Sequence, residues 1–189
     1  MRLILIRHGK TEANEHHLYC GSTDLPLSET GRQELDARKN SYPSVSGFHI
    51  VTSGLRRCEE TLSVLFGDLP HETYPAFAEM DFGRFEMFSY EQLKNDVDYI
   101  SWITGNNEAN LCPGGESGEL MTRRVLTALY ELIENDRDTL VVTHGGPIAA
   151  IMAELFPDER KNRYEWQPAS GGGYEITFAD GKQIYSRID

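Results

Sequence analysis

Two histidines, His8 and His144, stand at positions where a side chain can do chemistry. Each lies at the end of an apolar run, 3–6 and 139–143, and each directly precedes a glycine. Imidazole is well suited to act as a nucleophile or as an acid–base group near neutral pH. If both runs are strands of one sheet, the two rings can face each other across one crevice. The alternative for His8 is a strand-end turn in which its ring only caps backbone groups.

Arginines accompany these histidines. Arg7 directly precedes His8, and Arg56 and Arg57 follow a third apolar run that ends near Ser53. The chain as a whole has a formal net charge of −12. Arginines that gather at a site must therefore create a local positive pocket in an acidic molecule. We expect such a pocket to attract an anionic group.

The elements that must position these residues alternate between strand and helix patterns. Apolar runs and periodicity predict strands at 3–6, 48–52 and 139–143, a weaker strand at 72–74, and a hairpin of 174–178 and 183–187 around a turn at 180–181. Three- and four-residue spacing and caps predict helices from Ser28 to about Lys39, from Leu55 to Leu65, at 90–94 and 97–103, from after Gly115 to near Asn135, and from Gly145 to about Phe156.

This order predicts an α/β fold. We expect a three-layer sandwich with a mostly parallel central sheet, helices on both faces and a C-terminal antiparallel hairpin. Ligands of such sheets bind beyond the carboxyl ends of the strands, which is where both histidines fall. The length of 189 residues fits a single domain over 1–189, with a less regular insertion at about 76–113 that covers the site.

Composition narrows the class of protein. Three cysteines without paired spacing, Cys20, Cys58 and Cys112, predict neither a disulfide framework nor a zinc motif, and favour the reducing cytoplasm. The first apolar run is too short for a signal peptide, and no run is long enough to cross a membrane. The net charge of −12 argues against nucleic acid or an anionic membrane as a partner.

Six segments, in their order and spacing, resemble the histidine phosphatase superfamily, whose members share the phosphoglycerate-mutase-like fold. The segments are Arg7-His8-Gly9 with Thr11 and Asn14, Gly21 with Asp24, Leu27, Ser28 and Gly31, Ser53-x-Leu55-x-Arg57, Glu79-x-x-Phe82-Gly83, residues 114–117, and residues 143–146. The resemblance covers nearly the whole chain. It implies a phosphohydrolase that needs neither a metal nor a cofactor and acts on a small phosphorylated metabolite.

The resemblance makes His8 the nucleophile, which attacks phosphorus through a neutral ring nitrogen. A phosphohistidine intermediate splits one difficult transfer into two easier ones. Arg7 and Arg57 would hold the phosphoryl oxygens with forked donors, and His144 and Asn14 would donate to the same oxygens. The residues Gly21 and Gly145 would border this phosphate site. Arg56 is expected to be a solvated helix residue.

The resemblance also assigns the proton donor to Glu79. One carboxyl group can protonate the departing ester oxygen and later deprotonate water. Phe77, Met80 and Phe82 surround it in the sequence and could disfavour its ionised form. The alternative is a surface glutamate in a loop. Cys20 occupies a phosphate-site position where the superfamily often has a hydroxyl residue, and a thiol is a weaker donor.

Within the superfamily, the chain resembles the alpha-ribazole phosphatases of cobalamin assembly. The segments that carry this resemblance are 79–87, 18–21, Tyr99-x-x-Trp102 and 171–174, with Phe85 at a position where tryptophan is common. The alternatives are a phosphoglycerate mutase, a broad-specificity phosphatase of sugar phosphates or nucleotides, and a phosphate-binding regulator without turnover. The residues around the acid, 79–87 in this chain, form the acid segment. Mutases usually have Glu-Arg-x-Tyr at the acid segment, and their chains are longer. A regulator without turnover is expected to lack one of four residues that are all present here: His8, Arg57, His144 and Glu79.

Overall fold

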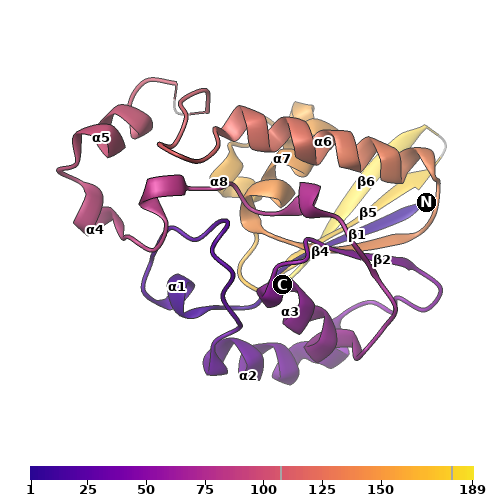
Figure 1. Cartoon of the computed structure of the whole chain (residues 1–189). Helices are drawn as coiled ribbons and strands as arrows, with labels where there is room; N and C mark the ends of the chain where they lie inside the picture. The colour runs from indigo at the N-terminus through magenta and orange to yellow at the C-terminus, as the bar shows by residue number, and fades with distance from the viewer. Residues whose placement is uncertain (107, 180) are drawn as a thin grey trace.

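The computed structural model describes residues 1–106, 108–179 and 181–189. Within these residues, six strands form one sheet in the order β3-β2-β4-β1-β5-β6 (Figure 1). The strands are β1 (Arg2–Arg7), β2 (His49–Thr52), β3 (Glu72–Thr73), β4 (Thr139–Thr143), β5 (Gly173–Ala179) and β6 (Lys182–Ile188). Strands β3, β2, β4 and β1 are parallel neighbours, whereas β5 pairs antiparallel with both β1 and β6. The sheet is therefore mostly parallel at one edge and antiparallel at the other.

Helices follow most of the strands in the described residues. They are α1 (Glu12–Glu15), α2 (Glu29–Arg38), α3 (Arg56–Phe66), α4 (Tyr90–Leu93), α5 (Val97–Ile103), α6 (Gly118–Glu134), α7 (Gly145–Leu155) and α8 (Arg163–Trp166). Short 3-10 turns lie at Lys39–Ser41, Pro75–Phe77, Gly83–Phe85 and Pro157–Glu159. None of the described helices is long and apolar enough to cross a membrane.

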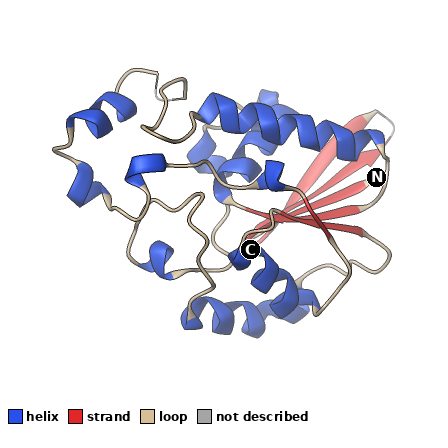
Figure 2. Ribbon diagram, viewed as in Figure 1, coloured by secondary structure: helices blue, strands red, loops and turns tan. Residues whose placement is uncertain are grey.

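The strands bury both faces. Leu3 and Leu5 of β1 pack into a cluster with α6 and α7, whereas Ile4 and Ile6 pack into a second cluster with α2 and α3. This period-2 alternation is the geometry of a strand whose successive side chains point to opposite faces. Figure 1 and Figure 2 show α6 and α7 on one side of the sheet and α2 and α3 on the other. The predicted three-layer α/β fold is confirmed.

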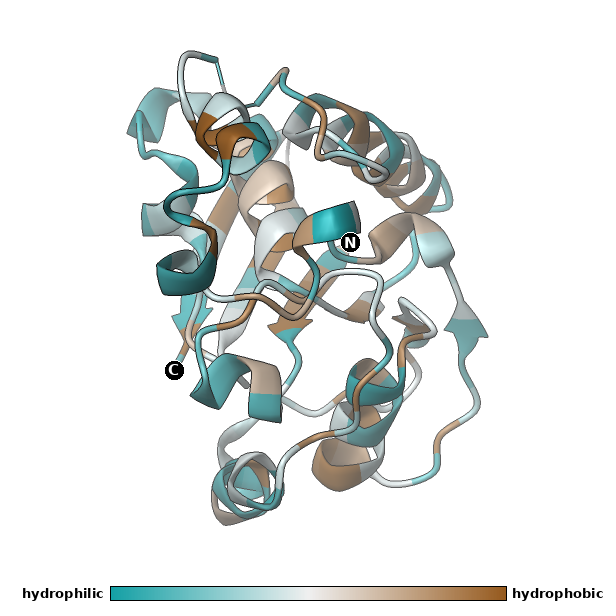
Figure 3. Cartoon of the chain, turned by 60° about the vertical axis from the view of Figure 1, so that its left-hand side comes forward, coloured by the Kyte–Doolittle hydropathy of each residue, from teal (hydrophilic) through white to brown (hydrophobic). Residues whose placement is uncertain are grey.

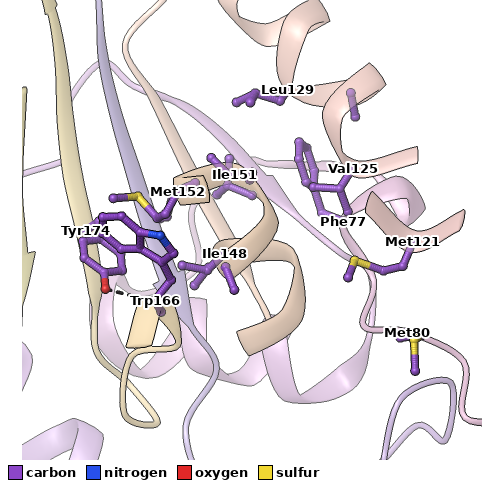
Figure 4. Packing of buried hydrophobic residues seen from close by; sticks show 14 of the residues in the cluster. Phe77, Met80, Met121, Val125, Leu129, Ile148, Ile151, Met152, Trp166 and Tyr174 are labelled. Atoms are coloured by element: carbon purple, nitrogen blue, oxygen red, sulfur yellow. Dashed lines mark hydrogen bonds between the residues drawn. The ribbon is translucent and has the colours of Figure 1, made fainter. Parts of the chain in front are cut away.

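The larger cluster lies between α6, α7 and the sheet. Figure 4 shows Ile148, Ile151 and Met152 of α7 in this space. At its edge, Trp166 of α8 packs against Tyr174 of β5, whose hydroxyl donates to the Trp166 carbonyl at 3.0 Å. Helix α8 therefore contributes Trp166 to the core, whereas its Tyr164 and Glu165 are exposed.

Most predicted elements match to within a few residues. Ser28 and Ser117 are the N-caps of α2 and α6, and their side chains accept from the backbone N–H of Gly31 and Leu120. The short helices α1 and α8 were not predicted. Asp180, half of the predicted hairpin turn, lies outside the described residues.

The segment 76–113 contains the short helices α4 and α5 and one of the 3-10 turns. Figure 1 shows α4 and α5 displaced from the sheet, beside the loop that follows β1. Figure 3 brings this side forward and shows that hydrophilic and hydrophobic residues are mixed along its helices. That this segment is an insertion over the site stays a prediction.

Candidate active site

The carboxyl ends of β1, β4 and β2 bring the predicted residues together. Arg7 at the end of β1 pairs with Thr143 at the end of β4, and the His8 backbone N–H donates to the Thr143 carbonyl at 2.9 Å. His144 follows β4 directly. The rings of His8 and His144 lie with centroids 5.1 Å apart at an interplanar angle of 63°. The two histidine rings therefore lie beside each other at the carboxyl ends of β1 and β4.

His8 is held in one tautomer. It is 5% exposed, and its Nδ1 lies 2.6 Å from the Gly9 carbonyl oxygen. A carbonyl only accepts, so Nδ1 carries the proton and Nε2 keeps its lone pair. Burial first, and then the positive charges of Arg57 and Arg7, lower the pKa of His8 well below its ordinary value. The ring is therefore neutral at neutral pH.

Arg57 is fixed by two loop carbonyls. It is 1% exposed, and its guanidinium donates to the Gly21 carbonyl at 2.6 Å and to the Thr23 carbonyl at 2.8 Å. Gly21 itself has no room for a side chain, because a Cβ there would lie 1.7 Å from the Met80 carbonyl oxygen. Arg56, in contrast, points outward and pairs with Glu60 at 2.8 Å.

His144 uses both ring nitrogens inside the protein. Nδ1 accepts from Arg57 Nε at 3.3 Å, and Nε2 lies 2.9 Å from Ser53 Oγ and 3.5 Å from Cys58 Sγ. These partners place the proton on Nε2. Burial, and then the charge of Arg57, lower the pKa of His144 well below its ordinary value. The contacts of Ser53 and Cys58 with His144 were not predicted, although Ser53 belongs to the Ser53-x-Leu55-x-Arg57 segment.

Glu79 lies at the N-terminus of α7. Its carboxylate accepts from the backbone N–H of Met80 and of Gly146, both at 3.0 Å. A Cβ on Gly146 would lie 2.2 Å from Glu79 Oε1, so a side chain at this position would displace the carboxylate. The helix dipole and the free N–H groups of the first turn favour an acidic group at this place.

Arg124 of α6 anchors the backbone that carries Glu79. Its guanidinium donates to the carbonyls of Ala76, Ala78 and Glu79 at 2.7–2.9 Å and pairs with Glu116 at 2.8 Å. Arg124 could not be predicted from the sequence, because nothing in the pattern of α6 separates it from a solvated arginine.

A cavity of about 280 Å³ opens beside these groups. Its wall contains Arg7, Asn14, Leu18, Tyr19, Cys20, Glu79, Met80, Phe82, Trp102, Ile103, Gly146, Arg163, Tyr164 and Gln167. The buried rings of His8 and His144 are not part of this wall, but Arg7 belongs to it and lies next to His8 in the chain. A larger groove of about 600 Å³ between the Pro75 turn and α6 contains none of the predicted site residues.

Asn14 and Cys20 both reach this cavity. Asn14 Oδ1 accepts from the Thr11 backbone N–H at 3.0 Å, so the oxygen is used by the cap of α1 and the amide N–H₂ remains available as a donor. The Cys20 thiol donates weakly to the Thr23 carbonyl at 3.5 Å, and burial raises its pKa. The thiol is thus protonated and directed to the backbone.

Gly145 and Arg7 lie close together at another edge of the candidate site. A Cβ on Gly145 would lie 3.3 Å from the Gln167 side chain and 3.4 Å from Arg7 Cζ. Arg7 donates to the Pro168 carbonyl at 2.8 Å, while its buried Nε has no acceptor within the described residues. Nor do three His, Cys, Asp or Glu side chains in those ranges lie close enough to hold a metal ion.

Comparisons with known proteins agree on the family. The sequence profile of the histidine phosphatase superfamily (branch 1) matches residues 3–188. An adenosylcobalamin/alpha-ribazole phosphatase of Salmonella typhimurium is 29% identical over 96% of this chain and 92% of its own. The solved alpha-ribazole phosphatase of Shigella flexneri superposes with a TM-score of 0.86 at 27% identity, covering 100% of this chain and 96% of its own. A phosphoglycerate mutase structure from Thermus thermophilus superposes with a TM-score of 0.78 at 26% identity, covering 100% and 99%.

Proposed function

Because the chain belongs to the histidine phosphatase superfamily, we propose that this phosphatase works through a phosphohistidine at His8 and that its substrate is alpha-ribazole 5′-phosphate or the equivalent phosphorylated cobalamin precursor. The observation that carries the mechanism is the contact between His8 Nδ1 and the Gly9 carbonyl. It leaves Nε2 as the free nucleophilic nitrogen of a neutral ring.

In the first step, the Nε2 lone pair of His8 attacks phosphorus and the bond to the ester oxygen breaks. Glu79, as a carboxylic acid, gives its proton to the departing oxygen. The His8 ring becomes cationic when Nε2 is phosphorylated, and the Gly9 carbonyl that accepts from Nδ1–H stabilises that charge. Water then attacks phosphorus, Glu79 takes its proton, and the bond to Nε2 breaks.

The phosphoryl oxygens are held by Arg7, Arg57 and the Asn14 amide. Such preorganised donors provide most of the catalysis in phosphoryl transfer. His144 can donate from Nδ1 only when that nitrogen is protonated, because its Nε2–H already faces Ser53. A bound dianionic phosphoryl group offsets the arginine charges that lower the pKa of His144, and so favours that protonated form.

The substrate proposal rests on the relatives and on the cavity. The Salmonella typhimurium and Shigella flexneri relatives both have alpha-ribazole phosphatase in their names. The cavity beside Arg7 has an aromatic and aliphatic wall formed by Tyr19, Phe82 and Trp102, among others, which suits an alcohol group with a flat ring. The net charge of −12 supports a small metabolite rather than nucleic acid, and the thiols of Cys58 and Cys112 support a cytoplasmic location.

A phosphoglycerate mutase is the second candidate, favoured by the Thermus thermophilus match. It would use the same His8 and return the phosphoryl group to a sugar-acid oxygen. The acid segment favours hydrolysis, because Met80 and Phe82 stand where mutases usually have arginine and tyrosine.

Phosphate release without added metal tests the proposal. The assay compares alpha-ribazole 5′-phosphate with sugar phosphates, 3-phosphoglycerate and nucleoside monophosphates, and uses His8→Ala as the control. We expect a kcat/KM for alpha-ribazole 5′-phosphate at least tenfold (~1.4 kcal/mol) above the rest of the panel, and loss of all activity in the variant. Activity that survives in His8→Ala would refute the phosphohistidine. Equal, weak hydrolysis of every compound would refute the substrate.

A further inference from the structure

A glutamine that the proposed mechanism does not use borders the same cavity as Arg7 and Glu79. Gln167 is the C-cap of α8, and its backbone N–H donates to the Arg163 carbonyl at 3.1 Å. The carbonyl of the next residue, Pro168, accepts from Arg7 at 2.8 Å. The backbone is therefore held on both sides of Gln167, and its side chain has a defined place beside the end of β1.

The Gln167 side chain lies next to the Arg7 guanidinium. A Cβ on Gly145 would lie 3.4 Å from both Arg7 Cζ and Gln167 Oε1, so the two side chains meet over this glycine. The Glu79 carboxylate lies in the same way over Gly146, the next residue of α7. Three polar side chains of the cavity wall are thus arranged around the first turn of α7.

The Gln167 amide is available to a ligand. It forms no hydrogen bond within residues 1–106, 108–179 and 181–189, although the side chain is half-buried. Neither of its polar atoms is closed off from solvent, in contrast to the buried Nε of Arg7. A ligand atom in the cavity therefore has room to contact the amide.

The neighbourhood of Arg7 indicates which ligand atom this is. An anion that binds to Arg7 offers acceptor oxygens, and a glutamine amide has two N–H donors for them. A carboxylate at the same position would instead pair with Arg7 and compete with the anion. A neutral donor beside a cation is therefore suited to a phosphoryl oxygen.

We propose that the side-chain N–H₂ group of Gln167 donates a hydrogen bond to an oxygen of the transferring phosphoryl group, beside Arg7. This role rests on the proposed function, in which Arg7 holds the phosphoryl group. It makes Gln167 a further binding residue for every phosphomonoester that the enzyme accepts, because the contact is to the group that all of them share.

Inorganic phosphate is the probe, measured as a competitive inhibitor of 4-nitrophenyl phosphate hydrolysis. An inhibition constant does not depend on the fraction of enzyme that is folded. Gln167→Leu fills similar space without polar atoms, and we expect it to raise the inhibition constant about tenfold or more, because a hydrogen bond to a charged acceptor is lost. Gln167→Glu should raise it further, since its carboxylate repels phosphate and pairs with Arg7.

The kcat/KM values of two esters separate the phosphoryl group from the alcohol part of the substrate. We expect Gln167→Leu to lower kcat/KM for 4-nitrophenyl phosphate and for alpha-ribazole 5′-phosphate by similar factors. Gln33→Leu is the matched control. It removes an exposed amide of α2 that donates to Glu29, and we expect it to keep the native constants.

A native phosphate inhibition constant in Gln167→Leu, or a loss of kcat/KM confined to alpha-ribazole 5′-phosphate, would overturn the role of Gln167. Poor hydrolysis of alpha-ribazole 5′-phosphate by the native enzyme, together with weakened phosphate inhibition in Gln167→Leu, would instead refute the proposed substrate and keep that role.

Discussion

At the scale of single residues, His8 and His144 differ in the hydrogen-bond partners of their ring nitrogens. Among the described residues, only Nδ1 of the His8 ring has a hydrogen-bond partner, the Gly9 carbonyl, whereas His144 has Arg57 on one nitrogen and Ser53 on the other. The ring with a free lone pair is suited to attack phosphorus. The ring with two partners is suited to positioning. This asymmetry, rather than the presence of two histidines, supports the proposal that His8 is the nucleophile.

Glu79→Gln tests the proton donor. We expect the kcat for alpha-ribazole 5′-phosphate to fall by about 10²–10⁴, because the departing alkoxide must be protonated. Hydrolysis of 4-nitrophenyl phosphate should fall by less than about tenfold, since nitrophenolate leaves without a proton. Steady-state kinetics on both esters give the comparison, with the exposed Glu119→Gln as control. Equal losses on both esters would remove Glu79 from this role.

At the scale of elements, the Glu86 carboxylate joins the loop that follows β1 to the acid segment, beside the contact of Ser22 Oγ with Asp81. Glu86 accepts from the backbone N–H of Gly21, Ser22, Thr23 and Phe82 at 2.9–3.2 Å. Gly21 and Thr23 in turn supply the carbonyls that fix Arg57. The position of Arg57, the proposed phosphate-binding arginine, therefore depends on a residue of the segment that also carries Glu79, the proposed proton donor.

Glu86→Ala should release this connection. It leaves several backbone donors without their acceptor, so we expect the free energy of unfolding to fall by about 1–3 kcal/mol and KM for a phosphomonoester to rise. Urea unfolding and steady-state kinetics measure the two effects. Glu91→Ala removes an exposed carboxylate that pairs only with Lys94 and should change stability by less than about 0.5 kcal/mol. A Glu86 variant as stable and active as the Glu91 variant would contradict the connection.

At the scale of the whole molecule, two buried neutral histidines link stability to pH. Burial and the nearby arginine charges lower the pKa of both His8 and His144. The unfolded chain therefore binds protons that the folded chain does not. The stability that these groups confer is present above the unfolded pKa of about 6.5 and is lost as the pH falls below it.

The free energy of unfolding should fall between pH 6.5 and 5 with a slope of up to about 1.4 kcal/mol per pH unit for each histidine. His144→Gln should reduce this slope by about half, because one titrating group is gone. His17→Asn is the control, since His17 is exposed and asparagine tolerates its positive φ of 54°. Urea unfolding at a series of pH values measures the slope. An unchanged slope in His144→Gln would rule out this explanation.

The layers of the fold could be predicted from the sequence, and so could the residues that come together at the carboxyl ends of β1, β2 and β4. Residues 3–6 and 140–142 are apolar at every position because both faces of the parallel strands are buried, and this pattern indicates strands. Four residues are too few for a hydrophobic period, and the helices α1 and α8 were missed, whereas α4, which is equally short, was predicted. Their capping boxes, Thr11 with Asn14 and Asn162 with Glu165, were the available signal.

Only the tertiary structure decided how those residues are held. The tautomer of His8 depends on the carbonyl of the next residue, whereas the Ser53 contact of His144, the Arg124 anchor and the Glu86 connection join groups that are far apart in the sequence. Hydrogen-bond satisfaction is a property of the packed molecule, because a donor has no assigned partner until the chain around it has folded.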